Sequence, residues 1–245
     1  MKLLFEGKDI TNDVSIDACY HDMYSDGRSD SLVIKFDDID RVWDAWKPAT
    51  DNIVAVEEGP ARTGKMFIHN IEPENGKYIL TALAVPTNYA DARSKSWEQV
   101  RLFQIGKEIA ERYGFIFQQY GALDQTFPYL MQQEDDFSFL QKICDLAGCK
   151  FLVFNGMLIF YSMSYIEKQD PAYELILKPD TRFEWECTKS GKVGVIWSDL
   201  IPELAACSVV NLRTNGYSNW DGPVFIYHIR HDYIKRKSKI FFRKI

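Results

Sequence analysis

The segment "EEGPARTGKM", which ends at Met66, has the residue types of a phosphate-binding loop. Gly59, four further residues, Gly64 and Lys65 follow the spacing at which backbone amides and a lysine bind nucleotide phosphates. A working loop of this kind ends in Ser or Thr, which holds magnesium, and it opens a helix whose dipole faces the phosphate. Here Met66 occupies the Ser or Thr position, and the residues after it alternate like a strand. The pattern therefore favours a turn between strands over the loop of a nucleotide-dependent assembly factor.

Histidine and cysteine pairs are the residues whose spacing could hold a metal ion. His228 and His231 are three apart in a predicted strand, so their side chains point to opposite faces unless a bulge intervenes. Cys144 and Cys149 lie on either side of a predicted helix end, and a zinc site would need two more ligands of matching spacing. The five cysteines are an odd number without a framework, which predicts reduced thiols and no disulfide.

The charged residues suggest no catalytic arrangement. Adjacent carboxylates occur at Asp37-Asp38, Glu57-Glu58 and Asp135-Asp136. A glycan hydrolase needs two carboxylates placed across one bond by the fold, whereas neighbours on a strand point to opposite faces. The basic cluster from Lys235 to Lys239 could contact phosphate or lipid headgroups, but it is more typical of a solvated hairpin turn. Arg62 and Lys65 are predicted to contact protein. We predict no catalytic, cofactor-binding or metal-binding residue and no enzyme activity.

Antiparallel strands are predicted to position these residues in the first third of the chain. In the stretch 14–22, Val14, Ile16, Ala18 and Tyr20 alternate with polar residues and Cys19, which predicts one buried and one wet face. The stretches 31–38, 52–58, 65–71 and 77–85 predict further strands. Asn75-Gly76 predicts the tight hairpin that joins the last two.

The period changes near residue 87. Ser96-Trp97-Glu98-Gln99 has the pattern of a capping box and predicts a helix start, followed by an apolar stripe that ends at Gly114. Asp135-Asp136 predicts a second helix, which runs to Gly148. Asn155-Gly156 then predicts a hairpin between two apolar runs. The segment 87–168 is therefore interpreted as a small α/β domain.

The last third is predicted to be β again, in the stretches 173–179, 182–188, 192–198 and 223–245. The segment Pro202–Gly222 fits no period and is predicted to be a long loop with weak local order. Two β halves around an α/β insert suggest a repeated barrel.

Length, composition and charge limit the classes of protein that this chain can belong to. It has 245 residues, of which 46% are hydrophobic and 26% charged, as in ordinary globular proteins. A net charge of −6 argues against a general nucleic-acid binder, because the neutralisation of phosphates needs a basic surface. No stretch approaches the ~20 apolar residues of a membrane span, and "MKLLFEGKDI" becomes polar too soon for a signal peptide. We therefore expect a protein synthesised in the cytoplasm.

The order of four stretches carries a resemblance to a known family. They are "DSLVIKFDD" with the following "WDAWKP", "SWEQVRLFQIGKEIAERYGF", "QQEDDFSFLQKICDLAGCKFLVFNGMLIF" and "GPVFIYHIRHDYIKRKSKIFFRKI". Together they cover most of the chain, and their order resembles the phage late control D, or tail baseplate hub, family. The resemblance lies in patterns rather than in invariant catalytic residues.

This resemblance implies a fold class and a role. The fold is α+β, with two tail-tube-like antiparallel β-barrels at 1–86 and 169–245 flanking a small α/β domain at 87–168. The implied protein is a structural baseplate hub at the tip of a phage tail or of a phage-like contractile bacteriocin. A homotrimer presents six barrels to the hexameric tail tube and seats the trimeric spike, with tape measure protein and other baseplate subunits as further partners. The resemblance also implies that the protein is located in the tail. DNA would then pass through the channel of the ring without specific binding.

Three classes of function remain open at this point. A structural hub is the leading hypothesis, and the edge strands of its barrels are the expected contacts, because unpaired edges invite partners. A tail-associated peptidoglycan-degrading enzyme is the alternative, and it would require clustered Glu and Asp, or Cys and His, in a cleft. A nucleotide-dependent assembly factor rests on residues 59–65 alone.

Overall fold

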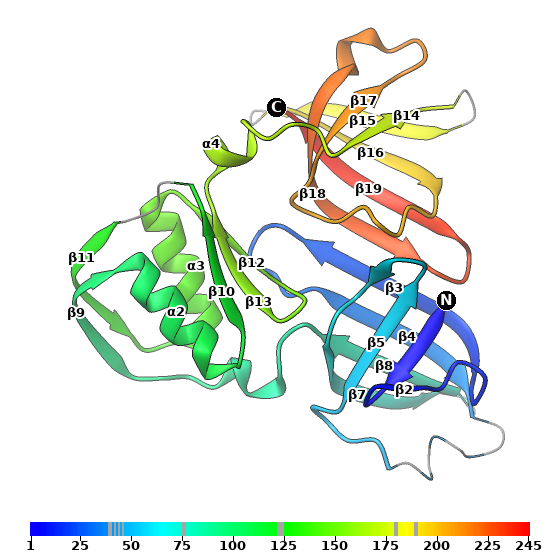
Figure 1. Ribbon diagram of the computed structural model, residues 1–245, viewed down its shortest axis with the longest axis horizontal. Coiled ribbons are helices and arrows are strands. Elements are labelled where there is room, and N and C mark those ends of the chain that lie inside the picture. The colour runs from blue at the N-terminus through cyan, green and yellow to red at the C-terminus, as the bar shows by residue number, and fades with distance from the viewer. Residues whose placement is uncertain are drawn as a thin grey trace.

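The computed structural model of the chain describes residues 1–38, 41, 43, 45, 47–74, 77–121, 125–178, 181–188 and 191–245. Fourteen strands form one sheet, in which β3 (Ser15–Tyr24), near the N-terminus, pairs with β18 (Gly222–Asp232), near the C-terminus. Figure 1 shows this pairing joining the blue N-terminal strands to the orange and red C-terminal strands, with the green helices to one side. The two predicted β halves are therefore continuous through one sheet.

The N-terminal β part comprises strands β1 to β8. Their bounds are β1 Lys2–Phe5, β2 Lys8–Asp9, β3 Ser15–Tyr24, β4 Ser31–Asp37, β5 Ile53–Glu58, β6 Ala61–Arg62, β7 Met66–Glu74 and β8 Lys77–Leu83. From the pairing with β18, the order runs β3, β4, β8, β7, β5, β1, β2, and each neighbouring pair is antiparallel. The prediction for β4 is confirmed, since its alternate residues Leu32, Ile34 and Phe36 are buried. The predicted Asn75-Gly76 turn lies outside the described residues, as do parts of "WDAWKP".

The burial predicted for β3 is wrong in its second half. Ile16 and Ala18 are only half-buried, whereas Cys19 and His21, predicted to be wet, are buried. The register between β3 and β4 shifts between Ile16 and Ala18, which marks a β-bulge. One extra residue reverses the alternation of faces downstream of it, so Cys19, His21 and Met23 point into the protein.

The C-terminal β part comprises β14 to β19. Their bounds are β14 Tyr173–Ile176, β15 Arg182–Thr188, β16 Gly191–Asp199, β17 Val209–Arg213, β18 Gly222–Asp232 and β19 Lys237–Lys244. Prediction of a weakly ordered loop at Pro202–Gly222 is wrong, because β17 lies within it and pairs with both β14 and β18. The buried residues Val209, Val210 and Leu212 explain this order. The pairing of β14 with β17 is parallel, which departs from the predicted antiparallel pattern.

The α/β module contains β9 to β13 and two helices. Their bounds are β9 Lys95–Arg101, α2 Leu102–Arg112, β10 Ile116–Tyr120, β11 Thr126–Gln132, α3 Asp136–Ala147, β12 Lys150–Phe154 and β13 Met157–Tyr161. The helices lie between the β9/β11 pair and the three-stranded sheet of β10, β13 and β12 (Figure 1). A short helix, α4 (Met163–Ile166), leads out of the module. None of the helices in the described residues is long and apolar enough to cross a membrane.

The two helix predictions had different outcomes. The second is confirmed, because the Asp135 carboxylate accepts hydrogen bonds from the amides of Phe137 and Ser138, and Gly148 ends α3 with φ +67°. The first start is wrong, because 96–99 lie in β9, whose Trp97 and Val100 are buried. Helix α2 begins at Leu102, and the Gln104 side chain accepts the Arg101 amide there. Pairing with β11 thus outweighs the local capping pattern.

The hydrophobic core crosses the boundaries between these parts. One cluster of buried side chains runs from the N-terminal β part into the module and includes Trp43, Met66, Ile109 and Phe160. A second cluster fills the C-terminal β part, and Met23 of β3 belongs to it. The chain is mostly β with few helices, as predicted. Among the described residues β14 and β15 do not pair with each other, so closed barrels remain a prediction.

Candidate functional site

The loop at residues 59–65 has the geometry of a turn. Strands β5 and β6 pair at Glu58 and Ala61, so Gly59, with φ +60°, lies in the two-residue connection of a hairpin. The buried Thr63 then accepts the Val56 amide through its hydroxyl at 3.0 Å and donates its own amide to the Val56 carbonyl. Strand β7 follows at Met66. The interpretation as a turn between strands is confirmed.

Gly64 has a packing role rather than a phosphate-binding one. Its φ is +73°, and a β-carbon placed there would lie 2.8 Å from the α-carbon of Asn155 in the β12–β13 turn. We expect Gly64→Ala to lower the free energy of unfolding by roughly 2 to 3 kcal/mol, since it combines left-handed strain with a backbone clash. Chemical denaturation measures the loss.

Two control variants separate these causes. Gly59→Ala has similar strain but open space around it, so about 1 kcal/mol is expected. Lys65→Ala, at an exposed side chain, should change stability by less than about 0.5 kcal/mol and leave assembly unchanged. A Gly64→Ala protein as stable as wild type would contradict the packing role, and nucleotide-dependent loss of assembly in Lys65→Ala would contradict the turn interpretation.

The two histidines of β18 have separate partners, as predicted for opposite faces. His228 donates from Nε2 to Asp22 Oδ1 at 2.8 Å, and its ring stacks on Tyr24 and Phe241. Arg230 donates from Nε to both oxygens of the same carboxylate, at 2.9 and 3.0 Å. Burial raises the pKa of Asp22, but these hydrogen bonds outweigh it and hold that pKa below the usual range. The network crosses the β3–β18 pairing and ties the two β parts together.

His231 lies in a buried chain of hydrogen bonds. Its Nε2 lies 2.9 Å from the Leu204 carbonyl, which can only accept, so Nε2 carries the proton. Nδ1 then accepts from the Ser238 hydroxyl at 2.9 Å, and that oxygen accepts the Ile201 amide. Burial lowers the pKa of His231, so the ring is neutral.

His21 faces His231 directly across the β3–β18 pairing. The ring centroids are 6.5 Å apart, and both side chains are almost inaccessible to water. Burial, followed by the neighbouring His231, lowers the pKa of His21 to about 3. Nε2 of His21 has no hydrogen-bond partner among the described residues. The pair is therefore uncharged at neutral pH.

The cysteine pair and the adjacent carboxylates, the other candidates for metal binding or catalysis, occupy structural positions in the fold. Cys144 and Cys149 are buried free thiols, and all five cysteines are free, as predicted. Within the described residues no group of three or more His, Cys, Asp or Glu is placed to hold a metal ion. Each adjacent carboxylate pair has partners in the fold: Asp37 binds Lys77, Glu57 binds Arg62, and Asp135 caps α3. The prediction of no catalytic or metal-binding residue stays a prediction.

Asp136 is the centre of a buried charge network in the module. Its side chain is fully buried, and its carboxylate accepts hydrogen bonds from Arg112, from Gln132 at 2.7 Å, from Tyr113 at 2.8 Å and from Arg93 at 3.1 Å. Burial alone raises the pKa of Asp136, but the hydrogen bonds from Arg112, Gln132 and Tyr113 hold it below its usual range. This charge joins β11, α2 and α3.

The basic cluster at Lys235 to Lys239 lies only in part in the turn between β18 and β19, because Lys237 to Lys239 already belong to β19. Asp232 pairs with Lys237 across the turn, and Lys237 binds Asp199 at 2.8 Å. Arg236 reaches across to Glu58 of β5. Acidic residues therefore neutralise part of the basic cluster. The ion pair between Arg236 and Glu58 also links the two β parts.

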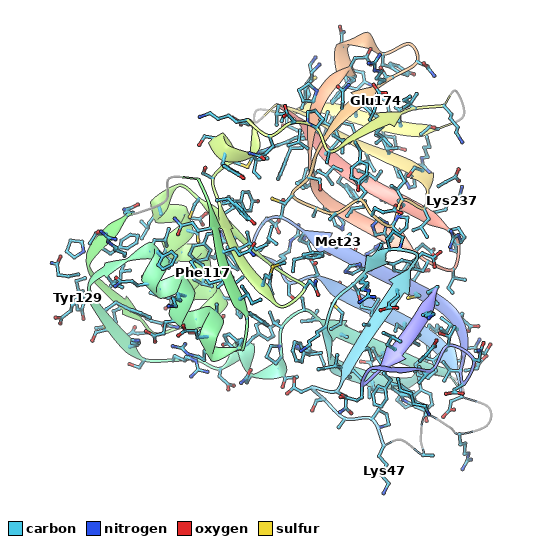
Figure 2. The ribbon with its side chains drawn as sticks, in the orientation of Figure 1. Met23, Lys47, Phe117, Tyr129, Glu174 and Lys237 are labelled. Atoms are coloured by element: carbon cyan, nitrogen blue, oxygen red, sulfur yellow. The ribbon has the colours of Figure 1, made fainter. Side chains whose placement is uncertain are left out.

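Some strand edges have no partner strand among the described residues, and exposed apolar side chains lie on these strands and on the module. At the two ends of the C-terminal β part, β14 exposes Tyr173 and Ile176, and β15 exposes Trp185, each between 44% and 58%. The module exposes Ile116 and Tyr129 as well, and Figure 2 shows Tyr129 on its outer side. Exposed apolar side chains beside open edges are typical of protein contact sites.

Sequence reasoning missed Asp22, Asp30 and His21 as residues of interest. The alternation places His21 on the wet face of β3, and the bulge that buries it has no clear local signal. Asp22 is buried by His228 and Arg230 of the distant strand β18, which the local pattern does not reveal. Asp30 precedes β4 and is buried beside a cavity that segments distant in the sequence also line. For Asp136, the adjacent pair indicated a helix start but not the distant arginines that surround it.

The fold of the chain is that of known tail proteins. It matches the 43 kDa tail protein of prophage MuSo2 from Shewanella oneidensis with a TM-score of 0.73 and 12% identity, over 99% of this chain and 96% of that one. It matches a tail protein from Neisseria meningitidis MC58 with a TM-score of 0.75 and 9% identity, over 99% and 95%. A scan against protein-family models finds no match, and a search of the curated proteins finds none either.

A secretion-system protein has the same fold. The E. coli c3393 protein, a component of the type VI secretion system with structural similarity to the T4 bacteriophage tail proteins gp27 and gp5, matches with a TM-score of 0.73 and 14% identity. The match covers 100% of this chain and 77% of that one. These three structures are tail proteins or a secretion-system component, which is consistent with the prediction of a non-enzymatic protein.

Proposed function

We propose that the chain is a structural hub of a phage or phage-like tail. One observation carries the proposal: a single sheet runs through both β parts, keeps open edges, and has the fold of two tail proteins over nearly their whole lengths. In this proposal residues 1–86 and 169–245 form two tail-tube-like β-barrels around the α/β domain 87–168. Three copies form a ring that adapts a hexameric tail tube to a trimeric spike.

The internal contacts support such a role. A ring that transmits force between tube and spike needs its two β parts fixed relative to each other. The Asp22 network and the ion pair between Arg236 and Glu58 both cross between these parts. The exposed apolar residues at the ends of the C-terminal sheet supply surface for a neighbouring copy.

Mass measurement and imaging test the proposal together. Light scattering after size exclusion should give three times the mass of the chain for the isolated protein, and the larger mass of a joint assembly after mixing with tube and spike proteins. Electron microscopy of assembled tails should place the ring between tube and spike. A protein that is monomeric within assembled tails contradicts the proposal.

An edge variant locates the contact between copies. We expect Ile176→Lys, at a residue 58% exposed on β14, to weaken trimer formation by at least about tenfold, because a charge on an edge opposes strand addition. Sedimentation at a series of concentrations measures this change.

Ile116→Lys is the matched control for that variant. It makes the same substitution at an isoleucine 65% exposed on β10 of the module. Trimer formation should be unaffected by it. Equal weakening by both variants would show that the ends of the C-terminal sheet are not the contact.

A further inference from the structure

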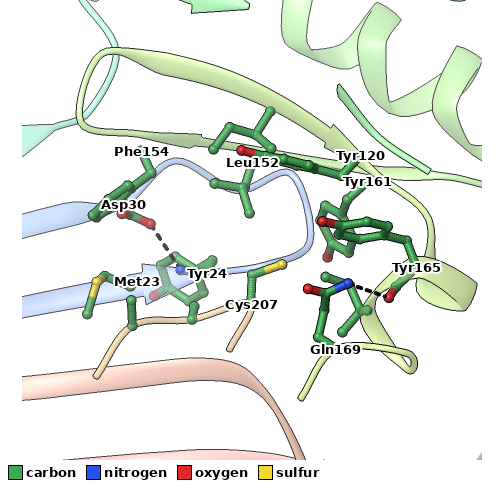
Figure 3. A pocket seen from close by; sticks show the side chains of 14 residues that line it. Met23, Tyr24, Asp30, Tyr120, Leu152, Phe154, Tyr161, Tyr165, Gln169 and Cys207 are labelled. Atoms are coloured by element: carbon green, nitrogen blue, oxygen red, sulfur yellow. Dashed lines mark hydrogen bonds between the residues drawn. The ribbon is translucent and has the colours of Figure 1, made fainter. Parts of the chain in front are cut away.

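A cavity of about 400 Å³ lies where the three parts of the protein meet. Strand β3, the β12–β13 hairpin, α4 and the segment 205–207 supply its walls. Figure 3 shows Asp30, Phe154 and Met23 towards one end and Tyr120, Tyr161 and Tyr165 gathered at the other. The volume is within the range of sites for small organic ligands, roughly 300 to 1,000 Å³.

Asp30 is the polar group that distinguishes this cavity. Its side chain is 3% exposed and lines the cavity. Oδ1 accepts the Tyr24 amide at 3.0 Å, while Oδ2 has no hydrogen bond among the described residues. Burial raises the pKa of Asp30 well above its usual value, and the nearby charge of Asp22 adds to this.

The other buried acids in the described part of the chain have cations, whereas Asp30 has none. Asp22 binds His228 and Arg230, and Asp136 binds Arg93 and Arg112. The closest basic residue in sequence, Arg28, donates to both oxygens of Asp26 and lies over the Tyr24 ring. Buried carboxylates are normally paired or hydrogen-bonded at both oxygens.

The rest of the wall is apolar or aromatic. Leu152, Ile159 and Ile166 line it together with the tyrosines, and Tyr120 and Tyr165 stack with centroids 5.5 Å apart. The Tyr161 hydroxyl donates to the Ser25 carbonyl, so its proton is not available to a ligand. Such a wall suits the stem of a ligand, and a single acid at one end suits a cationic head.

We propose that the cavity binds an organic cation, an ammonium group on an apolar stem, which supplies the missing counterion of Asp30. The ammonium donates to Oδ2, and the stem extends along the apolar wall towards the tyrosines. Such a group can come from a free amine or from a lysine side chain of a polypeptide. Both sources have the same chemistry.

Calorimetry on the full chain tests the site with 4-phenylbutylamine and its neutral analogue, 4-phenylbutanol. The amine should bind at least about tenfold more tightly than the alcohol, because a hydrogen-bonded ion pair adds to the shared apolar contact. A blocked peptide with one lysine between two phenylalanines forms the second arm. Binding of the peptide alone assigns the cation to a polypeptide, and binding of the amine alone assigns it to a small molecule.

Variants connect the binding to Asp30. Asp30→Asn keeps the size of the side chain and the acceptor for the Tyr24 amide, and should reduce amine binding at least about tenfold. Asp26→Asn changes a more exposed neighbouring acid and should leave binding intact. Ala206→Phe fills the cavity from a half-buried position and should block binding if Asp30→Asn does not fold.

Three results would overturn the proposal. They are equal binding of alcohol and amine to the wild-type chain, amine binding retained in Asp30→Asn, and no binding of amine or peptide at millimolar concentrations. The comparison of amine with alcohol uses the unaltered protein, so it does not depend on the folding of any variant.

Discussion

Replacement of Asp136 by alanine is expected to lower the free energy of unfolding by about 3 kcal/mol. The loss has two sources. The half-buried Tyr113 hydroxyl loses its acceptor, and the buried Gln132 amide keeps only the Glu134 carbonyl. Arg93 loses its carboxylate partner, and Arg112 keeps only Glu108. Removal of one partner from a buried ion pair usually costs about 3 to 5 kcal/mol. The lower end applies here, because the side chains of Arg93 and Arg112 are 33% and 22% exposed and can reach water.

Asp135→Ala is a matched control one residue away. Asp135 caps α3 from a half-buried position and pairs with no cation among the described residues, so its loss should cost only about 1 kcal/mol. Urea denaturation of the three proteins at neutral pH gives both differences. If Asp136→Ala is no less stable than Asp135→Ala, the charge network is not a principal contributor to the stability of the module.

Mild acid is expected to destabilise the protein through His21. The pKa of His21 in the folded chain is about 3, far below the value of about 6.5 for an unfolded histidine, so the unfolded state binds the proton first. The stabilising effect is complete above pH ~6.5 and is lost as the pH falls through this window. One such histidine contributes about 1.4 kcal/mol per pH unit, or roughly 3 kcal/mol between pH 6.5 and 4. The lowered pKa of His231 acts in the same direction.

A leucine at position 21 should remove this part of the pH dependence. We expect His21→Leu to match or exceed wild-type stability at pH 8, because Nε2 has no partner there, and to lose less stability down to pH 4. Denaturation curves at each pH measure the slope. Met23→Leu, on the same buried face of β3, keeps both histidines and should keep the wild-type slope. Identical slopes for wild type and His21→Leu would rule out a role for this histidine.

Asp30 acts on stability in the opposite direction with pH. Its raised pKa means that the folded state holds the proton longer, so its stabilising contribution is present at low pH and is lost as the pH rises through the folded value. The comparison of His21→Leu with wild type cancels this effect, because Asp30 is the same in both proteins.

Local signals predicted the elements whose geometry is set by neighbouring residues. Asn155-Gly156 forms the predicted hairpin turn with positive φ at both positions, and α3 has the predicted caps. The turn at 59–65 was recognised because its Met66 and the following alternation excluded a helix. In each case the sequence within ten residues contains the cause.

Distant contacts decided the features that sequence reasoning missed. β9 forms because β11 pairs with it, although Ser96-Trp97-Glu98-Gln99 has a helix-start pattern. β17 forms because it lies between β14 and β18. The bulge after Ile16 moves His21 into the interior, and only the β3–β4 register reveals it. The cavity that Asp30 lines is formed in part by segments more than 80 residues away, which a local sequence pattern cannot reveal.

The pairing of β3 with β18 also determines when the sheet can be completed during synthesis. Asp22 and its partner His228 are 206 residues apart, and at roughly 5 to 20 residues per second β3 waits about 10 to 40 s for β18 to leave the ribosome. During that interval the edge of β3 in the nascent chain has no partner strand. Contacts between residues so far apart in the sequence also form slowly. Asp22 keeps this edge charged until His228 and Arg230 arrive. The Asp22 carboxylate, which joins the two β parts in the folded protein, therefore also opposes aggregation of the N-terminal β part before β18 is synthesised.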